Sequence, residues 1–347
     1  MKKLLFVAAL LALCVGMQAA KKKTVKAKPV VTEAPKLVAT MTEWHDMAVN
    51  NVNRVPVHTT FFAYENEALA LKGDMTKSSR FLSLHGTWKF RWVENADQRP
   101  DDFFKTDLDD SSWGTMPVPG MWELNGYGDA EYVNSGFAWR GHFDQKPPQA
   151  PVKDNHVGSY RRTFRIPADW AGKQVVARFG SVTSCIYLYV NGQFVGYSED
   201  SKVATEFDIT PFVKAGEENL IAFQVFRWCD GSWCEDQDFW RLSGVARDSY
   251  LFARDKDAHV DDLRITASLD DNYDKGTLLV QSTLPVQKSM VYELLDADGK
   301  SVFKVPTGCG VITADNIDVK HWTAETPYLY TLVAKVYAND VKLTRNW

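Results

Sequence analysis

Short stretches in which apolar and polar residues alternate dominate the chain from about residue 80 onward. The stretches "GTWKFRWV" (86–93) and "GSYRRTFRIP" (158–167) both show this pattern. Successive side chains of a strand point to opposite faces, so the alternation predicts strands with one buried face. The pair Asn191-Gly192 separates two β-rich runs and predicts a hairpin turn. Helical periodicity is nearly absent beyond a short piece near Glu65–Lys72.

These strands fall into two groups along the chain. Regular spacing with Gly, Pro and Asn between the runs predicts a β sandwich over residues 80–254. Residues 255–347 contain further alternating runs of similar length, including "GTLLVQSTLP" and "PYLYTLVAKVYAND", joined by turns such as Asp298-Gly299. About ninety such residues are typical of an immunoglobulin-like sandwich. The sequence therefore predicts an all-β protein of two sandwiches.

The N-terminal residues have the pattern of a targeting segment. Two lysines precede an apolar run from Leu4 to Met17, and small residues follow, so residues 1–20 are predicted to be a secretory signal peptide. The apolar run is too short for a membrane span. Cys14 raises a lipoprotein alternative, which the large Leu13 before it disfavours. We expect an exported protein, periplasmic or extracellular, with an N-terminal arm over 21–79 that is flexible to about residue 40.

Charge and cysteine content narrow the function classes. The formal net charge is −4 and becomes more negative once the signal is removed, so no basic field attracts nucleic acid. Export permits disulfides, and Cys229 and Cys234 are close enough in sequence for a small bridge. Alternatively, all the cysteines outside the signal are buried small hydrophobes, namely Cys185, Cys229, Cys234 and Cys309. Their spacing is not a zinc signature.

The stretch "GSWCEDQDFWRLSG" (231–244) places three carboxylates among three large aromatic residues. Clustered carboxylates repel each other and need water, a cation or hydrogen-bond donors, whereas aromatic side chains favour burial. The carboxylates are Glu235, Asp236 and Asp238. By composition alone, Asp238 fits an exposed turn better than a ligand site.

Several motifs in a fixed order carry a family resemblance. They are "WHDMAVNNVNRVPVH", "LSLHGTWKFRW", "VPGMWELNGYGDAEYVN", "VNGQFVGYSEDSKVATEFDIT", "EDQDFWRLSGVARD" and "HWTAETPYLYTL". From about Trp44 to Tyr330 the chain resembles the N-terminal part of family 2 glycoside hydrolases, most closely the large bacterial β-galactosidases. The resemblance implies a sugar-binding jelly roll over 80–254 and an immunoglobulin-like domain over 255–347. In the family a TIM barrel follows, which needs roughly 250 residues and is absent from this sequence.

The resemblance also assigns roles in the 231–244 loop. Asp238 falls on the family's aspartate that holds galactosyl hydroxyls and a sodium ion, and Asn134 of "EYVN" falls on an asparagine that contacts the sugar. A carboxylate is suited to both tasks. We expect Glu235 and Asp236 to brace the loop, with Arg227 or Arg241 as the cationic partner. The full enzyme is also expected to use magnesium.

Aromatic residues near these positions have two interpretations. Trp122 and Trp240 could stack on sugar rings, but we expect both to pack in the core. The chain has Ala246 in "SGVARD", where the family commonly places an aromatic residue, and we expect a softer loop as a result.

The predicted function is the recognition part of a β-galactosidase that hydrolyses terminal non-reducing β-D-galactosyl residues with retention. The two catalytic glutamates of the family lie on the barrel, so this chain is expected to contain no catalytic residue and to be inactive when isolated. Its expected partners are a β-galactoside, the missing barrel region and other copies in a homo-oligomer. The alternative is a stand-alone, non-catalytic carbohydrate-binding module. The sequence "EDQDFWR" of this loop disfavours specificity for a glucuronide or a mannoside.

Overall fold

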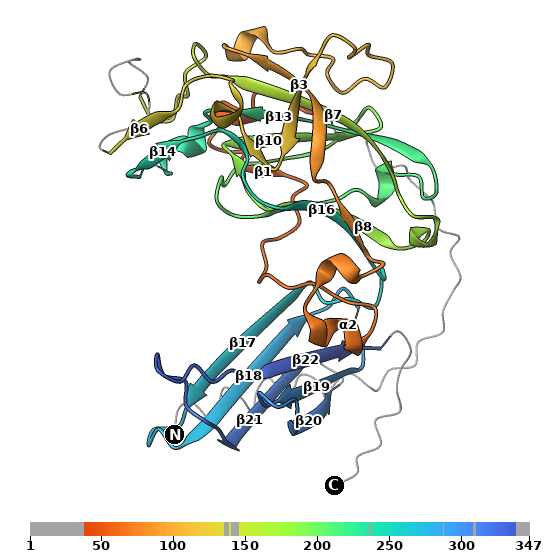
Figure 1. Cartoon of the computed structure of the whole chain (residues 1–347), viewed down its shortest axis with the longest axis vertical. Helices are drawn as coiled ribbons and strands as arrows, with labels where there is room; N and C mark the ends of the chain where they lie inside the picture. Colours follow the sequence, from red (N-terminus) through yellow and green to blue (C-terminus); the bar gives the residue numbers. More distant parts are fainter. Residues whose placement is uncertain are drawn as a thin grey trace, which may run out of the picture. The chain divides into compact units, whose positions relative to one another are not determined.

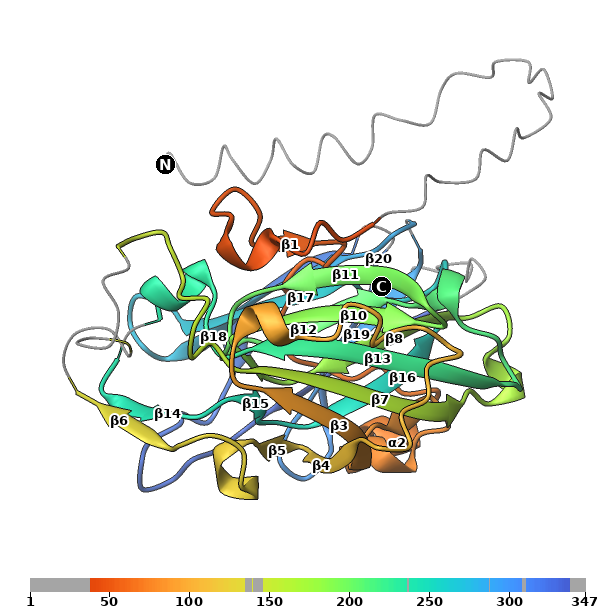
Figure 2. The ribbon, with the colours of Figure 1, turned by 90° about the horizontal axis from the view of Figure 1, so that it is seen from above.

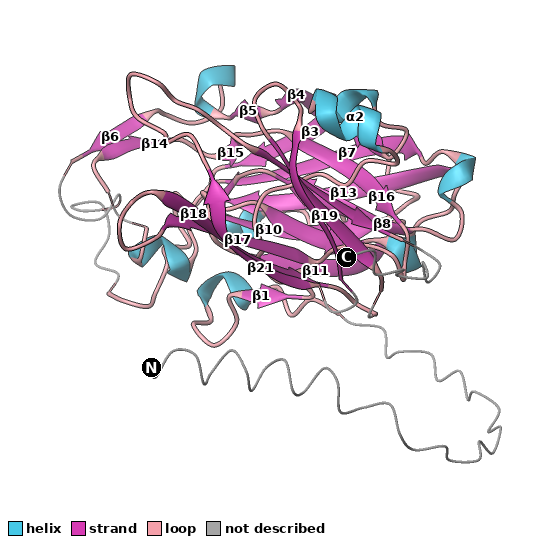
Figure 3. Ribbon diagram, turned by 90° about the horizontal axis from the view of Figure 1, so that it is seen from below, coloured by secondary structure: helices cyan, strands magenta, loops and turns pink. Residues whose placement is uncertain are grey.

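The computed structural model describes residues 38–134, 139, 146–235, 237–286, 288–307 and 310–337. The predicted signal peptide (1–20), the first part of the arm, and the individual residues Cys14, Asp236 and Cys309 lie outside the described residues. One compact unit is Leu37–Arg264, and the other contains the described residues from Ile265 onward. Strands dominate both units (Figure 3), which confirms the all-β prediction.

The first unit is built on a seven-stranded antiparallel sheet. Along the sheet the strands are β1 (Asn51–Val52), β11 (Gln193–Ser198), β10 (Cys185–Val190), β13 (Glu218–Phe226), β7 (Val157–Arg165), β3 (Gly86–Val93) and β4 (Gly114–Val118). The predicted turn at Asn191-Gly192 joins β10 to β11, and both residues have positive φ, 49° and 77°. Two consecutive positive φ values fit the turn that joins tight hairpins, so the hairpin prediction is confirmed.

A four-stranded sheet packs on one face of this sheet. Its order is β12 (Thr205–Asp208), β8 (Gln174–Phe179), β16 (Ser249–Arg254) and β2 (Phe81–Ser83). Alternate side chains of both sheets meet in one core, in which Phe223 of β13 and Phe179 of β8 have ring centroids 5.3 Å apart. Two facing antiparallel sheets that share a core are the predicted jelly-roll sandwich.

The second face of the seven-stranded sheet is buried as well. Tyr187 and Tyr197 point away from the first core and pack with Phe226 and with Trp44 of the N-terminal segment. Trp44 is 3% exposed, and its backbone N–H donates to the Tyr187 hydroxyl. This double burial explains why every residue of β10 is buried and why "CIYLYV" reads as a continuous apolar run.

Two small sheets and the helices complete the first unit. The small sheets are β14 (Phe239–Arg241) with β6 (Glu131–Val133), and β5 (Gly120–Met121), β15 (Gly244–Val245) and β9 (Val182–Thr183). The predicted helix is α2 (Glu67–Lys72), the single α-helix of the described residues, which Asn66 caps by accepting from Leu69 N–H. The 3-10 helices are η1 (Glu43–His45), η2 (Met75–Lys77), η3 (Ala96–Gln98), η4 (Glu123–Asn125), η5 (Ala168–Trp170), η6 (Thr210–Phe212) and η7 (Asp230–Trp233).

The second unit consists of two three-stranded antiparallel sheets. One has the order β17 (Asp262–Leu269), β18 (Lys275–Thr283) and β21 (Val311–Asp318), and the other β20 (Ser301–Thr307), β19 (Met290–Leu295) and β22 (Thr331–Val336). Tyr292 of β19 is fully buried, and its hydroxyl donates to Gly310 C=O next to β21. This arrangement is the predicted immunoglobulin-like sandwich.

Candidate functional site

The two predicted sugar-contacting residues lie at the end of one two-stranded ribbon, formed by β6 and β14. The antiparallel register pairs Phe239 with Val133 and Trp240 with Tyr132. Continued by one residue, the same register sets Asp238 opposite Asn134. β6 and β14 run side by side at one end of the first unit in two views (Figures 1 and 2). Residues more than a hundred positions apart in sequence are thus brought together.

The Asp238 carboxylate is held by a tyrosine of the partner strand. The Tyr132 hydroxyl donates to Asp238 Oδ1 at 2.5 Å, and this hydrogen bond raises the pKa of Tyr132. Both side chains are exposed to solvent. An ionised carboxylate accepts up to about four hydrogen bonds, so Tyr132 fixes the orientation of Asp238 while leaving acceptor capacity for a ligand.

The other face of the ribbon is anchored to the jelly roll. The Phe239 ring lies between the Arg241 guanidinium, 4.5 Å away, and the Lys202 ammonium, 5.0 Å away. Arg241 is 7% exposed and donates to Gln237 C=O at 2.7 Å. These contacts stabilise the loop beneath the Asp238 end of the ribbon.

A second anchor ties the other strand. Arg227, at the end of β13, donates to Glu131 of β6 at 2.9 Å, and its side chain is 5% exposed. A buried guanidinium that pairs with a carboxylate holds it in one geometry. Contacts with Arg227 and Arg241 therefore fix both strands of the ribbon on the face opposite Tyr132 and Trp240.

Glu235 braces the loop, but through a different partner from the one predicted. It accepts from the Ser201 backbone N–H at 2.7 Å and from the Ser201 hydroxyl, instead of pairing with Arg227 or Arg241. The sequence prediction was wrong because Ser201, in the loop after β11, is remote along the chain and reaches Glu235 only in the fold. The predicted bracing by Asp236 lies outside the described residues.

A cavity of about 30 Å³ lies beneath the ribbon and is lined in part by Phe239, Arg227 and Thr183. It is far smaller than a sugar ring and has room for about one water molecule. The Thr183 hydroxyl and Arg227 Nε are buried there without a hydrogen-bond partner among the described residues. The cavity thus suits an ordered water that supports the ribbon.

Another acidic cluster lies deeper in the fold. Glu199, Asp230 and Cys229 bring their ligand atoms within 4.8 Å of one another. Burial raises the pKa of Glu199 to about 8 and raises that of Asp230, and the two side chains hydrogen-bond to each other. Burial also raises the pKa of the Cys229 thiol. In the absence of a cation, burial and mutual repulsion favour the protonated forms, so Glu199 and Asp230 form a proton-sharing carboxyl pair.

The described cysteines are all free thiols. Cys185 and Cys229 are buried, as one interpretation predicted, but Cys234 is exposed and does not bridge to Cys229. The disulfide alternative is wrong, and so is burial for Cys234, because η7 turns the chain between Cys229 and Cys234 and directs Cys234 outward.

The two tryptophans differ in their environment. Trp122 is fully buried and donates through Nε1 to the Tyr160 hydroxyl at 2.5 Å, which confirms its predicted core position. Trp240 is 56% exposed, so the core prediction for it was wrong. Trp240 and Tyr132 occupy directly opposed positions of the ribbon, and their ring centroids are 5.7 Å apart. Tyr132 was missed at the sequence level, although the alternation in "EYVN" already places it on the same face as Asn134.

Models of two known domains match the chain. The domain described as "Glycosyl hydrolases family 2, sugar binding domain" matches residues 81–255. The chain belongs to glycosyl hydrolase family 2. A second model of this family, "Glycosyl hydrolases family 2", matches residues 258–345. None of the helices among the described residues is long and apolar enough to cross a membrane.

Curated relatives are similar over most of this family 2 chain. It is 38% identical to a β-galactosidase of Priestia megaterium over 84% of its length, and 38% identical to one of Halalkalibacterium halodurans over the same share. These matches span 30% and 29% of the two relatives. The β-galactosidase large subunit of Leuconostoc lactis is 33% identical over 86% of this chain and 49% of the relative. The chain thus spans between 29% and 49% of the length of these three relatives.

Solved structures share the fold. A β-glucuronidase of an uncultured Clostridium sp. superposes with a TM-score of 0.57 at 19% identity, covering 80% of this chain and 44% of that one. The β-glucuronidase of Ruminococcus gnavus also gives 0.57 at 19% identity, covering 76% and 44%. At this identity the likeness supports the family 2 architecture alone.

Proposed function

We propose that this chain is the substrate-recognition part of a β-galactosidase, and that Asp238 and Asn134 hold the galactosyl hydroxyls. The observation that carries the proposal is the register of β6 and β14, which sets Asp238 opposite Asn134 at an exposed ribbon end. A carboxylate accepts hydrogen bonds from sugar hydroxyls, and an amide both donates and accepts. The similarity to curated β-galactosidases supports galactose as the sugar.

Sodium is the proposed ion at Asp238. A hard cation prefers oxygen ligands, and the carboxylate of Asp238 and the side-chain oxygen of Asn134 are both of this type. Tyr132 already orients the carboxylate, which lowers the entropic cost of binding an ion there. The remaining ligands would come from the sugar, from water and from other parts of the full enzyme, which is also proposed to use magnesium.

Hydrolysis with retention is proposed for the full enzyme and not for this chain alone. Retaining glycosidases need two carboxyl groups about 5–5.5 Å apart that flank the scissile bond in an open site. Within the described residues, Glu199 and Asp230 are close together, but they are 9% and 7% exposed and do not line the cavity beneath the ribbon. We therefore expect the isolated chain to bind without hydrolysing. We also propose that residues 1–20 direct its export.

Titration of the isolated chain with methyl β-D-galactopyranoside, followed by saturation-transfer NMR, tests the binding proposal. We expect weak, sodium-dependent binding that is lost in Asp238→Asn and reduced for the C4 epimer, methyl β-D-glucopyranoside. The matched control is Asp298→Asn, at an exposed turn of the second unit, which should bind as the unmutated chain does. Equal binding by both variants would contradict the role of Asp238. Sub-millimolar affinity would favour the stand-alone binding module.

A further inference from the structure

One face of the β6–β14 ribbon displays two aromatic and two polar side chains together. Side chains alternate along a strand, and directly opposed residues of a pair share a face. The register therefore groups Tyr132 with Trp240 and places Asn134 and Asp238 on the same face, one step further along. Tyr132 is 52% exposed and Trp240 is 56% exposed.

The Tyr132 and Trp240 rings are exposed because the opposite face of the ribbon packs against the jelly roll. The opposite face is held down by Arg241 against Phe239 at 4.5 Å and by Arg227 on Glu131 at 2.9 Å. The two rings lie 5.7 Å apart in a tilted arrangement at 55°. Two adjacent exposed aromatic side chains present apolar surface that a ligand can cover.

The surrounding polar groups indicate which ligand fits. A carboxylate and an amide next to aromatic rings suit a molecule with hydroxyls on its edge and C–H groups on its face, which describes a pyranose. The negative Asp238 disfavours phosphate-bearing ligands. Residues i and i+2 of a strand are about 7 Å apart, so the backbone position of Trp240 lies about one sugar residue along the ribbon from Asp238. The Tyr132 side chain spans this interval, because its hydroxyl reaches Asp238 while its ring lies beside Trp240.

We propose that Tyr132 and Trp240 form a stacking platform for the second sugar ring of a β-galactoside, the ring that follows the galactosyl unit. This inference rests on the proposed function, because Asp238 and Asn134 must hold the first ring. The platform makes the chain selective for oligosaccharide galactosides over galactosides with a small aglycone.

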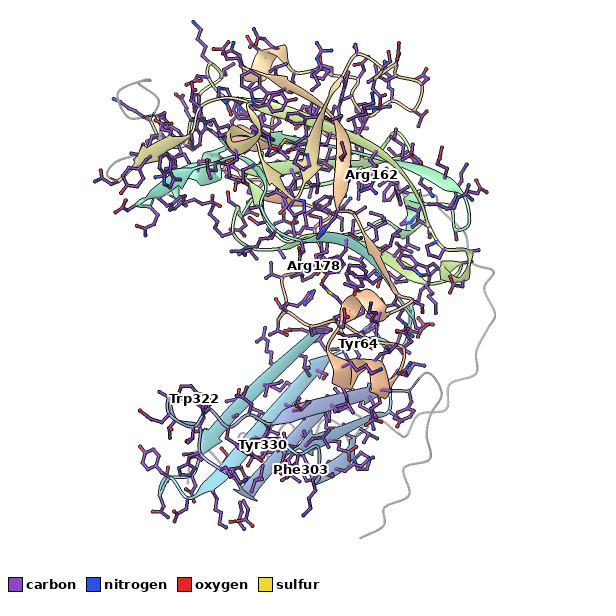
Figure 4. The ribbon with its side chains drawn as sticks, viewed as in Figure 1. Tyr64, Arg162, Arg178, Phe303, Trp322 and Tyr330 are labelled. Atoms are coloured by element: carbon purple, nitrogen blue, oxygen red, sulfur yellow. The ribbon has the colours of Figure 1, made fainter. Side chains whose placement is uncertain are left out.

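The test compares lactose with methyl β-D-galactopyranoside on the isolated chain by saturation-transfer NMR titration. The unmutated chain should bind lactose about three- to tenfold more tightly than the one-ring galactoside, the gain expected from one aromatic stacking contact. Trp240→Ala should remove this preference while leaving the affinity for the methyl galactoside unchanged. The control is Trp322→Ala, because Trp322 is 60% exposed in the second unit (Figure 4) and should have no role.

Each outcome separates the platform from the proposed function. A lactose preference that persists in both Trp240→Ala and Tyr132→Ala overturns the platform, even if Asp238→Asn abolishes binding and so upholds the galactosyl site. A Trp240→Ala variant that weakens both sugars equally also overturns it, since the ring would then act on the first sugar. If neither sugar binds the unmutated chain, the platform and the galactosyl site both fail, and Trp240 is left as a packing surface for another part of the protein.

Discussion

The Tyr132 hydroxyl donates a 2.5 Å hydrogen bond to the carboxylate of Asp238, which lies 106 positions further along the chain. This contact joins the two strands of the ribbon at its exposed end. It also gives Tyr132 two separable parts, a hydroxyl that orients Asp238 and a ring that lies beside Trp240.

Tyr132→Phe is predicted to weaken galactoside binding by a few-fold without destabilising the fold. The variant keeps the ring and removes the hydrogen bond, so the carboxylate loses its fixed orientation. Lactose and methyl galactoside should be affected equally, because the platform remains. Saturation-transfer titration of both sugars measures this effect. A loss confined to lactose would show that the hydroxyl acts on the second ring instead.

The buried pair of Glu199 and Asp230 is predicted to make stability fall as pH rises. The pKa of Glu199 is raised from 4.5 to about 8 in the folded chain, mainly by burial. Folding therefore favours the protonated form, so its contribution is present in full below about pH 4.5 and is lost as pH rises toward 8. Urea unfolding between pH 5 and pH 8.5 measures this contribution.

Glu199→Gln provides the matched comparison for the pH effect. The amide has nearly the shape of the protonated acid and does not titrate. Relative to the unmutated chain, the variant should gain on the order of 4 kcal/mol in free energy of unfolding between pH 5 and pH 8.5. A constant difference across this range would show that Glu199 carries no shifted proton.

Ser201→Ala is predicted to loosen the 231–244 loop. Its hydroxyl donates to Glu235, and removing it leaves one of the two hydrogen bonds that tie this loop to the segment after β11. We expect a loss of about 1 kcal/mol in free energy of unfolding and faster amide exchange at Phe239 and Trp240. Ser268→Ala, at an exposed position, is the control. Unchanged exchange in the loop would mean that Glu235 is held by other contacts.

Tyr160→Phe is predicted to destabilise the jelly-roll core by about 1–2 kcal/mol. It removes the acceptor for Trp122 Nε1, and a buried donor without a partner costs its full desolvation. Thermal or urea unfolding measures the loss. Tyr273→Phe, where the tyrosine is 71% exposed, should change stability little. If Tyr160→Phe leaves the free energy of unfolding unchanged, a water molecule must accept the hydrogen bond from Trp122 Nε1 in its place.

Local patterns were sufficient to predict the all-β class, the α2 helix and the β10–β11 hairpin. Each depends on neighbours in sequence: alternation sets a strand, Asn66 caps α2, and Asn191-Gly192 adopts the two positive φ values. The order of the sequence motifs was sufficient to identify the family. By contrast, the partner of Glu235 and the exposure of Trp240 depend on contacts between distant segments, and both predictions were wrong.

The sequence by itself determined which residues form strands, because side-chain type and period act over a few residues, and it predicted which residues carry sugar-binding chemistry. Only the tertiary structure decided how these residues meet. The register of β6 with β14 sets Asp238 opposite Asn134 and presents Trp240 to solvent, because Arg227 and Arg241 fix the other face of the ribbon from within the jelly roll. Such long-range pairing follows from packing of the whole sandwich, which no local pattern encodes.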